Sequence, residues 1–113
     1  MTPTSRWKAV ELWYCAKLGG RRRGADYGDF SGGKSDCADE LSYSVEIRHR
    51  KTISYADIIS QVAKAEARAH GDQIPIAISH TPGTPLRRGL VSMSFETFLA
   101  NFVGGLDDGN SSV

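Results

Sequence analysis

The segment from residue 43 to residue 51, YSVEIRHRK, alternates polar and apolar side chains, which is typical of a half-buried β-strand. One face of this strand carries its polar members: Ser44, Glu46, Arg48 and Arg50. Val45 and Ile47 then point to the opposite face, because successive side chains on a strand alternate. Any fold of this chain must therefore bury one face and place an acid beside an arginine on the other.

A second acid precedes this strand. Asp36 lies in a short strand-like stretch, and residues 39–42 have the composition of a turn. If the chain folds back as a hairpin, the carboxylate of Asp36 comes beside that of Glu46. Two close carboxylates repel each other and tend to share a proton or a cation, and Mg²⁺ suits such an oxygen site. The alternative is a solvated strand face with an ordinary Glu–Arg pair.

Length and composition indicate one globular domain over residues 1–104, followed by a flexible tail over residues 105–113. The net charge of +1 is too small to indicate any class of binding partner. The sequence has no signal peptide and no apolar run near the roughly 18 residues of a membrane span, so we expect a soluble, cytoplasmic protein. The two cysteines lack metal-type spacing; Cys15 is expected in the core, and neither cysteine suggests a disulfide scaffold.

A first helix is predicted over residues 6–18, with an apolar stripe at helical spacing. Glu11 lies inside this stripe, so its carboxylate must find a partner. It either bonds neighbouring backbone or borders the same site as Asp36 and Glu46. Leu12 and Trp13 lie off the stripe, which indicates a helix buried on two sides or a contact with another subunit.

Four further elements complete the pattern. Ser54 and Asp57 form a capping box that opens a helix over residues 55–69, and Gln61 flanks its buried stripe. The run Ile74–His80 is apolar enough for a buried strand. A second strand is expected at 89–93 and a last helix after Ser94. The predicted order is α-β-β-α-β-β-α.

Residues 19–35 are glycine-rich and are predicted to form a loop that contains Arg21, Arg22 and Arg23. Within it, Gly28–Ser35 satisfies the phosphate-loop pattern of nucleotide-binding proteins. That motif functions between a buried strand and a helix, and neither is expected here. The loop is interpreted as a segment that approaches a nucleic-acid backbone, or as a disordered connection.

Taken together, these residues resemble the PD-(D/E)XK nuclease superfamily, and most closely its archaeal and phage Holliday junction resolvases. The resemblance covers about residues 6–102 and rests on five features: Glu11, Asp36, the E-x-K signature Glu46-Ile47-Arg48, Ser31 in the basic loop, and Gln61. The chain departs from the pattern twice. Arg48 stands where lysine is usual, and Ser35 stands where proline is usual before the acid.

The resemblance implies a restriction-endonuclease-like α/β fold, with a mixed central sheet flanked by helices. It also implies a homodimer that cleaves branched DNA with Mg²⁺ or Mn²⁺. The implied metal site comprises Asp36, Glu46, the carbonyl of Ile47 and Glu11, with Arg48 and Gln61 in catalytic positions. The implied DNA contacts are Arg21, Arg22, Arg23, Ser31, Lys34, Arg50 and Lys51. Because arginine is effectively never deprotonated, Arg48 can bind a phosphate but cannot act as a base.

Two alternatives remain open from the sequence. One is a DNA-binding protein of the same fold that does not cleave its substrate. The other is a nucleotide-binding protein that uses Gly28–Ser35.

Overall fold

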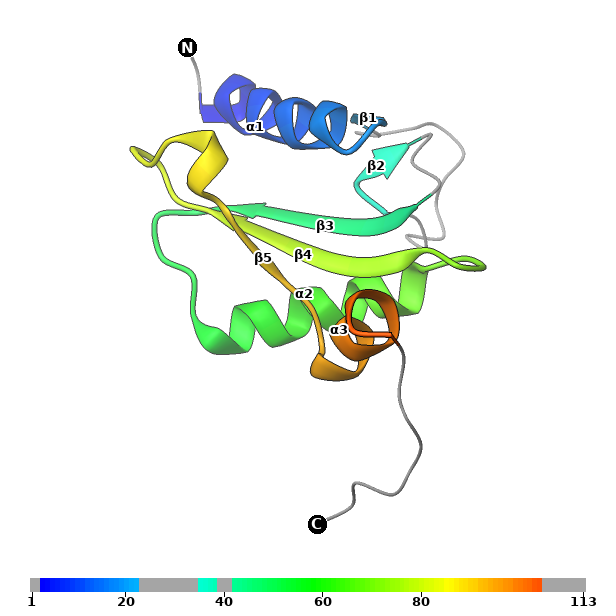
Figure 1. Cartoon of the computed structure of the whole chain (residues 1–113). Helices are drawn as coiled ribbons and strands as arrows, with labels where there is room; N and C mark the ends of the chain where they lie inside the picture. The colour runs from blue at the N-terminus through cyan, green and yellow to red at the C-terminus, as the bar shows by residue number, and fades with distance from the viewer. Residues whose placement is uncertain (1–2, 23–34, 39–41, 105–113) are drawn as a thin grey trace.

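A three-stranded sheet lies between helices on both of its faces (Figure 1). The computed structural model describes residues 3–22, 35–38 and 42–104. In chain order the elements are α1 (Pro3–Lys17), β1 (Arg21–Arg22), β2 (Cys37–Ala38), β3 (Tyr43–His49), α2 (Tyr55–Arg68), β4 (Ile74–His80), a 3-10 turn (Leu86–Arg88), β5 (Leu90–Ser92) and α3 (Phe95–Phe102).

The sheet has the order β3-β4-β5 and mixed direction. β3 and β4 are parallel, in a register that runs from Tyr43 beside Ile74 to His49 beside His80. β5 runs antiparallel to β4. Two parallel neighbouring strands require a crossover connection, and α2 supplies it. The α/β class and the mixed sheet flanked by helices therefore agree with the sequence-based expectation.

The core lies between α1 and the sheet, as the alternation of β3 predicts. Val45 and Ile47 pack there with apolar residues from α1 and β4: Val10, Tyr14, Cys15, Ile76 and Ile78. The polar face of β3 packs against α2 instead. There the Ser44 hydroxyl donates a hydrogen bond of 2.7 Å to the carbonyl oxygen of Ala65. Because Ala65 is small and fully buried, it lets the helix approach the strand closely.

The helix boundaries follow local capping rules. The Ser54 side chain accepts from the backbone N–H of Asp57, and the Asp57 carboxylate accepts from the N–H of Ser54, which completes the predicted capping box. Ser94 caps α3 in the same way through the N–H of Thr97. α1 ends before Gly19, whose φ of +95° is a left-handed conformation that favours glycine.

The predicted order of elements is wrong in one respect. Residues 21 and 22 form β1, which pairs antiparallel with β2, so the order is α-β-β-β-α-β-β-α. β2 consequently belongs to a separate two-stranded sheet and is not a strand of the central one. The glycine-rich composition around β1 hid a strand of only two residues. The turn at 39–41 and the tail at 105–113 lie outside the described residues.

None of the helices within the described residues combines the length and the apolar character needed to span a bilayer.

Candidate functional site

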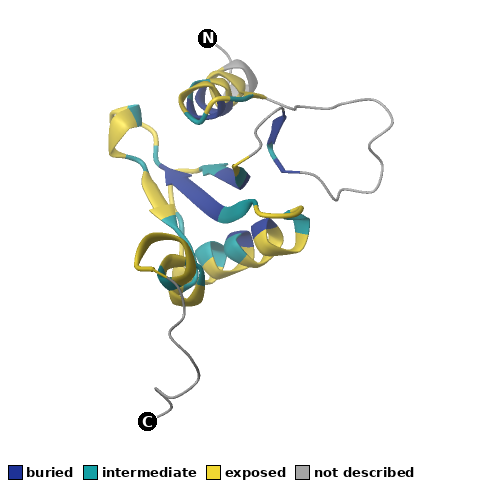
Figure 2. Cartoon of the chain, turned by 45° about the vertical axis from the view of Figure 1, so that its right-hand side comes forward, coloured by how far each residue is buried: buried dark blue, intermediate teal, exposed yellow. Residues whose placement is uncertain are grey.

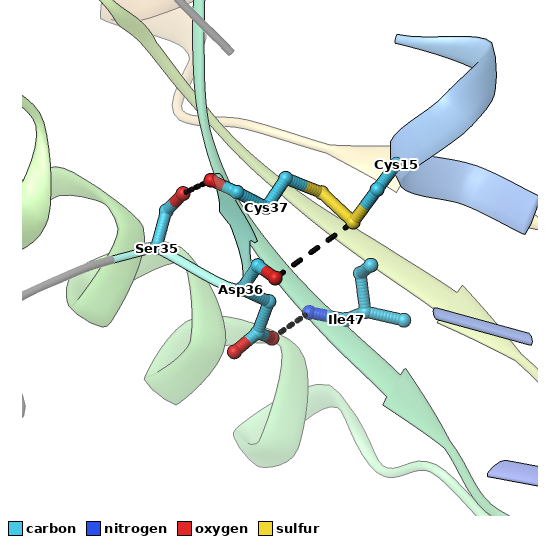
Figure 3. The surroundings of a disulfide bond; sticks show 5 residues. All are labelled: Cys15, Ser35, Asp36, Cys37 and Ile47. Carbon is cyan, nitrogen blue, oxygen red and sulfur yellow. Dashed lines mark hydrogen bonds between the residues drawn. A yellow bond between two sulfur atoms is a disulfide. The ribbon is translucent and has the colours of Figure 1, made fainter. Parts of the chain in front are cut away.

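Asp36 lies against the edge of β3 that faces away from β4. Its backbone N–H donates to the carbonyl oxygen of Val45 at 2.8 Å. Its carboxylate oxygen Oδ2 accepts from the N–H of Ile47 at 2.7 Å (Figure 3). Because the N–H and C=O of one strand residue point to the same side, the carbonyl of Ile47 points toward this edge as well. The expected return of the chain from Asp36 to the strand that carries Glu46 is therefore present.

A disulfide between Cys15 and Cys37 fixes the chain next to Asp36 (Figure 3). Cys15 is a buried core residue, as expected, but it forms a disulfide with Cys37, although neither cysteine suggested a disulfide scaffold in the sequence. The two residues are 22 positions apart in sequence, and their spacing gives no signal for pairing. They meet because β2 lies beside the end of α1, which brings their Cα atoms to 5.3 Å.

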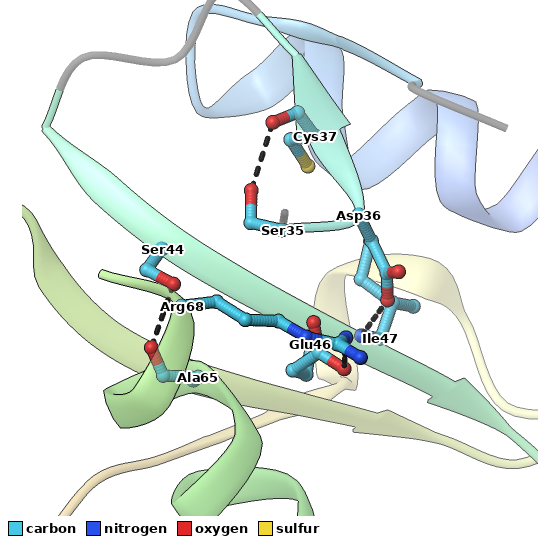
Figure 4. A network of polar contacts seen from close by, with 8 residues as sticks. All are labelled: Ser35, Asp36, Cys37, Ser44, Glu46, Ile47, Ala65 and Arg68. Atoms are coloured by element: carbon cyan, nitrogen blue, oxygen red, sulfur yellow. Dashed lines mark hydrogen bonds and ion pairs between the residues drawn. The ribbon is translucent and has the colours of Figure 1, made fainter. Parts of the chain in front are cut away.

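Glu46 points to the opposite side of the sheet from this core, and only 6% of the residue is exposed. Its Oε1 accepts a hydrogen bond of 2.8 Å from Nη1 of Arg68 on α2 (Figure 4). The pKa of Glu46 is raised to about 7, first by burial and second by the negative charge of Asp36, while Arg68 and Lys64 act in the opposite direction. Asp36 therefore lies close enough to Glu46 to influence the ionisation of Glu46.

Arg48 does not pair with Glu46, although the two side chains share one face of β3. Its guanidinium lies 3.8 Å from the carboxylate of Asp57, the residue that caps α2. Arg68 is the cation beside Glu46, and the sequence analysis did not identify it. The available signal was its place on the same stripe of α2 as Gln61 and Ala65, at helical spacing.

Gln61 lies at the level of Glu46. Two contacts fix the register of α2 against β3: Ser44 with Ala65, and Arg48 with Asp57. The helix therefore runs opposite to the strand. On α2, Gln61 is midway between Asp57 and Ala65. On β3, Glu46 is midway between Ser44 and Arg48, so Gln61 and Glu46 lie at the same level. Gln61 is 2% exposed, so it is a buried residue of this layer and not a surface residue of α2.

Several buried polar atoms in this layer have no hydrogen-bond partner among the described residues: Oε2 of Glu46, both amide atoms of Gln61, and Oγ of Ser79. Ser79 is in register with Arg48 on the neighbouring strand. Buried polar atoms without partners are rare in folded proteins, and they indicate that water or another ligand completes the site. Ser79 is a second residue that the sequence analysis did not identify.

Glu11 is buried on α1, one helical turn before Cys15. The disulfide to Cys37 turns this side of α1 toward the chain that carries Asp36. Among residues 3–22, 35–38 and 42–104, however, no three His, Cys, Asp or Glu side chains form a group that could hold a metal ion. The structure therefore brings Asp36 and Glu46 together, but does not assemble the expected triad of acids that includes Glu11.

The predicted DNA contacts are described only in part. Arg21 is exposed, Arg22 lies beside it in β1, and Arg50 and Lys51 are exposed after the end of β3. The other predicted contacts lie outside the described residues: Arg23, Ser31 and Lys34. The phosphate-loop pattern also lies outside them except for Ser35, whose hydroxyl donates to the carbonyl of Cys37. The chain continues from Ser35 into β2, so the helix that a phosphate loop requires does not follow it.

No protein-family model matches this chain, and searches of the curated proteins and of the solved structures find no match either.

Proposed function

We propose that this chain is a DNA endonuclease dependent on a divalent cation, with a restriction-endonuclease-like fold and a Holliday junction as its preferred substrate. The proposal depends mainly on one observation: the Asp36 carboxylate accepts from the N–H of Ile47, the residue next to Glu46, so the two acids come from separate segments and lie close together. The charge of Asp36 adds to the effect of burial in raising the pKa of Glu46 to about 7. Two close carboxylates repel each other and tend to share a proton or a cation. A perturbed pair of this kind is typical of a functional site.

The residues around this pair suit Mg²⁺. Asp36 and Glu46 offer carboxylate oxygens, and Oε2 of Glu46 is a buried oxygen that forms no hydrogen bond with the described residues. The carbonyl of Ile47 faces the same edge as Asp36. Magnesium is commonly held by one or two carboxylates together with substrate phosphates, so this donor set is sufficient. When bound, the ion lowers the pKa of a bound water and offsets charge on the scissile phosphate.

Arg68 has two roles in this proposal. Its ion pair with Glu46 favours the ionised carboxylate, the form that binds a cation. Its side chain is 25% exposed, so the guanidinium can also contact a phosphate group at the surface of the site. Arg48 occupies the signature position but is engaged by Asp57. We therefore assign the principal cationic role to Arg68 and a supporting role in phosphate binding to Arg48.

The direct test is a cleavage assay with four-way junctions, flaps, nicked duplex and plain duplex, with and without Mg²⁺ or Mn²⁺. We expect paired nicks in the four-way junction, and we expect Glu46→Gln to abolish them. Glu96→Gln is the matched control, because Glu96 is an exposed carboxylate on α3. If every DNA stays intact with both ions, the proposed hydrolysis is wrong.

A second candidate is a protein of the same fold that binds DNA without cleaving it. The observation that favours it is the engagement of Arg48 by Asp57, which leaves the signature position without a lysine and without a base. Tight binding of an intact junction in the presence of either ion would favour this candidate. Replacing Arg48 with lysine gives a further comparison, because a gain in cleavage would indicate a site suited to the usual lysine.

A further inference from the structure

A row of phenylalanine side chains lies on the outer surface of α3. Phe95 is 70% exposed, Phe98 42% and Phe102 50%. Their rings stack in sequence, with centroids 6.2 Å and then 5.9 Å apart. Figure 2 shows α3 largely in the colour of exposed residues. An amphipathic helix normally turns its apolar stripe toward its own core, so this helix presents an apolar face that the described residues do not cover.

The neighbouring strand β5 continues this apolar surface. β5 is the last strand in the order β3-β4-β5, so one of its edges has no partner strand in the described part of the chain. Leu90 is 66% exposed and Val91 57%, although their side chains point to opposite faces. Proteins usually protect a sheet edge with charges, proline or a covering element, and this strand contains no charge and no proline.

A groove of about 480 Å³ extends the surface from β5 to α2. Apolar side chains from both elements line it: Tyr55, Ile58, Ile59, Val62 and Met93. Tyr55 is 78% exposed at its rim. The exposed aromatic row, the free strand edge and the groove therefore lie on three neighbouring elements, α3, β5 and α2. We call them together the β5–α3 surface.

We propose that a second copy of this chain covers the β5–α3 surface, with the two β5 strands antiparallel about a two-fold axis. Complete burial of a phenylalanine or tyrosine removes about 150–250 Å² from water, and the four aromatic residues are 42–78% exposed, so each still offers roughly 100–150 Å². With the adjacent exposed aliphatic residues, the surface offers on the order of 800 Å² per copy. A standard protein interface needs about 800 Å² per partner. Monomeric proteins typically expose apolar patches of only about 300–600 Å².

Two properties of the surface favour a copy of the same chain as the occupant. A two-fold axis brings a strand edge against itself in antiparallel direction, so the unpaired groups of β5 find partners without any other protein. The net charge is only +1, so two copies do not repel each other strongly.

This inference does not rest on the proposed nuclease activity, but it has a consequence for where the candidate sites of the two copies lie in the dimer. Asp36 and Glu46 lie at or on β3, and β3 and β5 are the opposite edges of the sheet. A dimer joined through β5 therefore leaves both candidate sites at its outer ends and accessible.

The test is the molar mass of the full chain in solution, measured by sedimentation and light scattering over a range of concentrations. We expect a dimer for the wild type and a monomer for Phe95→Asp and Val91→Lys. Leu12→Asp is the matched control, because Leu12 is 55% exposed on α1 and should leave the dimer intact. Circular dichroism of each variant checks that the fold is retained, because all three positions are exposed.

Three outcomes would overturn the proposal. The first is a wild type that stays monomeric at every concentration. The second is a dimer that Leu12→Asp dissociates and Phe95→Asp does not, which would place the interface on α1. The third is a monomer that dimerises only after deletion of residues 105–113, which would mean that this segment covers the surface in the full chain.

Discussion

Arg68 on α2 donates a hydrogen bond of 2.8 Å to Glu46 on β3, and this ion pair is the contact that joins the candidate site to the crossover helix. Arg48, which is two residues from Glu46 in sequence, pairs with Asp57 instead. The two arginines therefore have separate partners, and we expect different effects when each of them is replaced.

Replacing Arg68 with alanine should raise the pKa of Glu46 above its value of about 7. Arg68 lowers this pKa both by its charge and by its hydrogen bond. Without Arg68, burial and the charge of Asp36 should therefore raise the pKa of Glu46 further. We also expect a loss of roughly 1–3 kcal/mol in the free energy of unfolding at neutral pH, because a buried acceptor loses its donor. An NMR titration of the Glu46 side-chain carbon measures the pKa directly.

The control for this experiment is Arg48→Ala. Arg48 is not among the groups that shift the pKa of Glu46, so this variant should titrate like the wild type at that carbon. An equal shift in both variants would show that general surface charge, and not the ion pair, sets the ionisation of Glu46.

Glu46→Gln should stabilise the protein at alkaline pH. The folded-state pKa of Glu46 is raised from 4.5 to about 7, so its contribution to stability is fully present below pH 4.5 and is lost as pH rises through 7. The variant lacks this titration and should therefore unfold at higher urea concentration than the wild type at pH 8, with a smaller difference at pH 5. Glu96→Gln should show no such pH-dependent difference, and a variant that is less stable at both pH values would contradict the assignment.

Mg²⁺ should raise the melting temperature, and the increase should be larger at pH 8 than at pH 6. The cation binds the ionised carboxylate, and Glu46 is largely protonated below its pKa of about 7. Differential scanning fluorimetry with and without the ion measures this effect without DNA and without turnover. Asp36→Asn should reduce the increase, because asparagine preserves the shape but removes one charge. A shift that does not depend on pH would indicate a cation bound elsewhere.

Replacing both Cys15 and Cys37 with serine should lower the free energy of unfolding by about 3 kcal/mol, because the disulfide closes a loop of 22 residues in the unfolded chain. Urea denaturation in the absence of reductant measures the loss. Mass spectrometry after alkylation, before and after reduction, counts the thiols. Two reactive thiols in the unreduced, denatured protein would show that the bond is absent in solution.

The contribution of His49 to stability should be lost as pH falls below 6.5, in the opposite direction to the contribution of Glu46. His80 Nε2 lies 2.6 Å from the carbonyl oxygen of Thr84 and must carry a hydrogen, so in the neutral ring its Nδ1 accepts from His49 Nδ1 at 2.8 Å. Burial first, and then the charges of His80 and Arg6, lower the pKa of His49 from its usual 6.5. A lowered pKa means that stability is present above 6.5 and is lost as pH falls through the folded-state value.

Thermal melts of His49→Phe between pH 5 and pH 8, compared with the wild type, measure this dependence, and the melting temperature of the variant relative to the wild type should rise as pH falls. His70→Gln is the control, because His70 is exposed and should retain the profile of the wild type. Identical profiles in all three proteins would exclude His49 as the source.

The sequence predicted those parts of the fold that local patterns determine. The apolar run Ile74–His80 and the capping box at Ser54 have unambiguous signals, and both are found at the predicted residues. The alternation of β3 predicted which face Val45 and Ile47 bury. These features depend on how often apolar side chains recur along the chain and on hydrogen bonds between residues close in sequence. A single sequence is therefore sufficient to predict them.

Features that depend on contacts between distant segments could not be predicted in the same way. Cys15 pairs with Cys37, and the two-residue strand β1 forms, where β2 packs beside α1. No repeating pattern in the sequence indicates that these segments meet. The position of Arg68 depends on how α2 lies across β3. The sequence singled out Asp36, Glu46 and Gln61, but it did not identify Arg68, the arginine that pairs with Glu46.

Within the described residues, the sheet stops at β3 because the Asp36 carboxylate takes the hydrogen bond of Ile47 that a further strand would otherwise accept. This acid cannot swing away without leaving a main-chain donor unsatisfied. Its position is therefore established when the chain folds, and no binding energy is needed to immobilise it. A ligand that arrives at this edge meets a preorganised group.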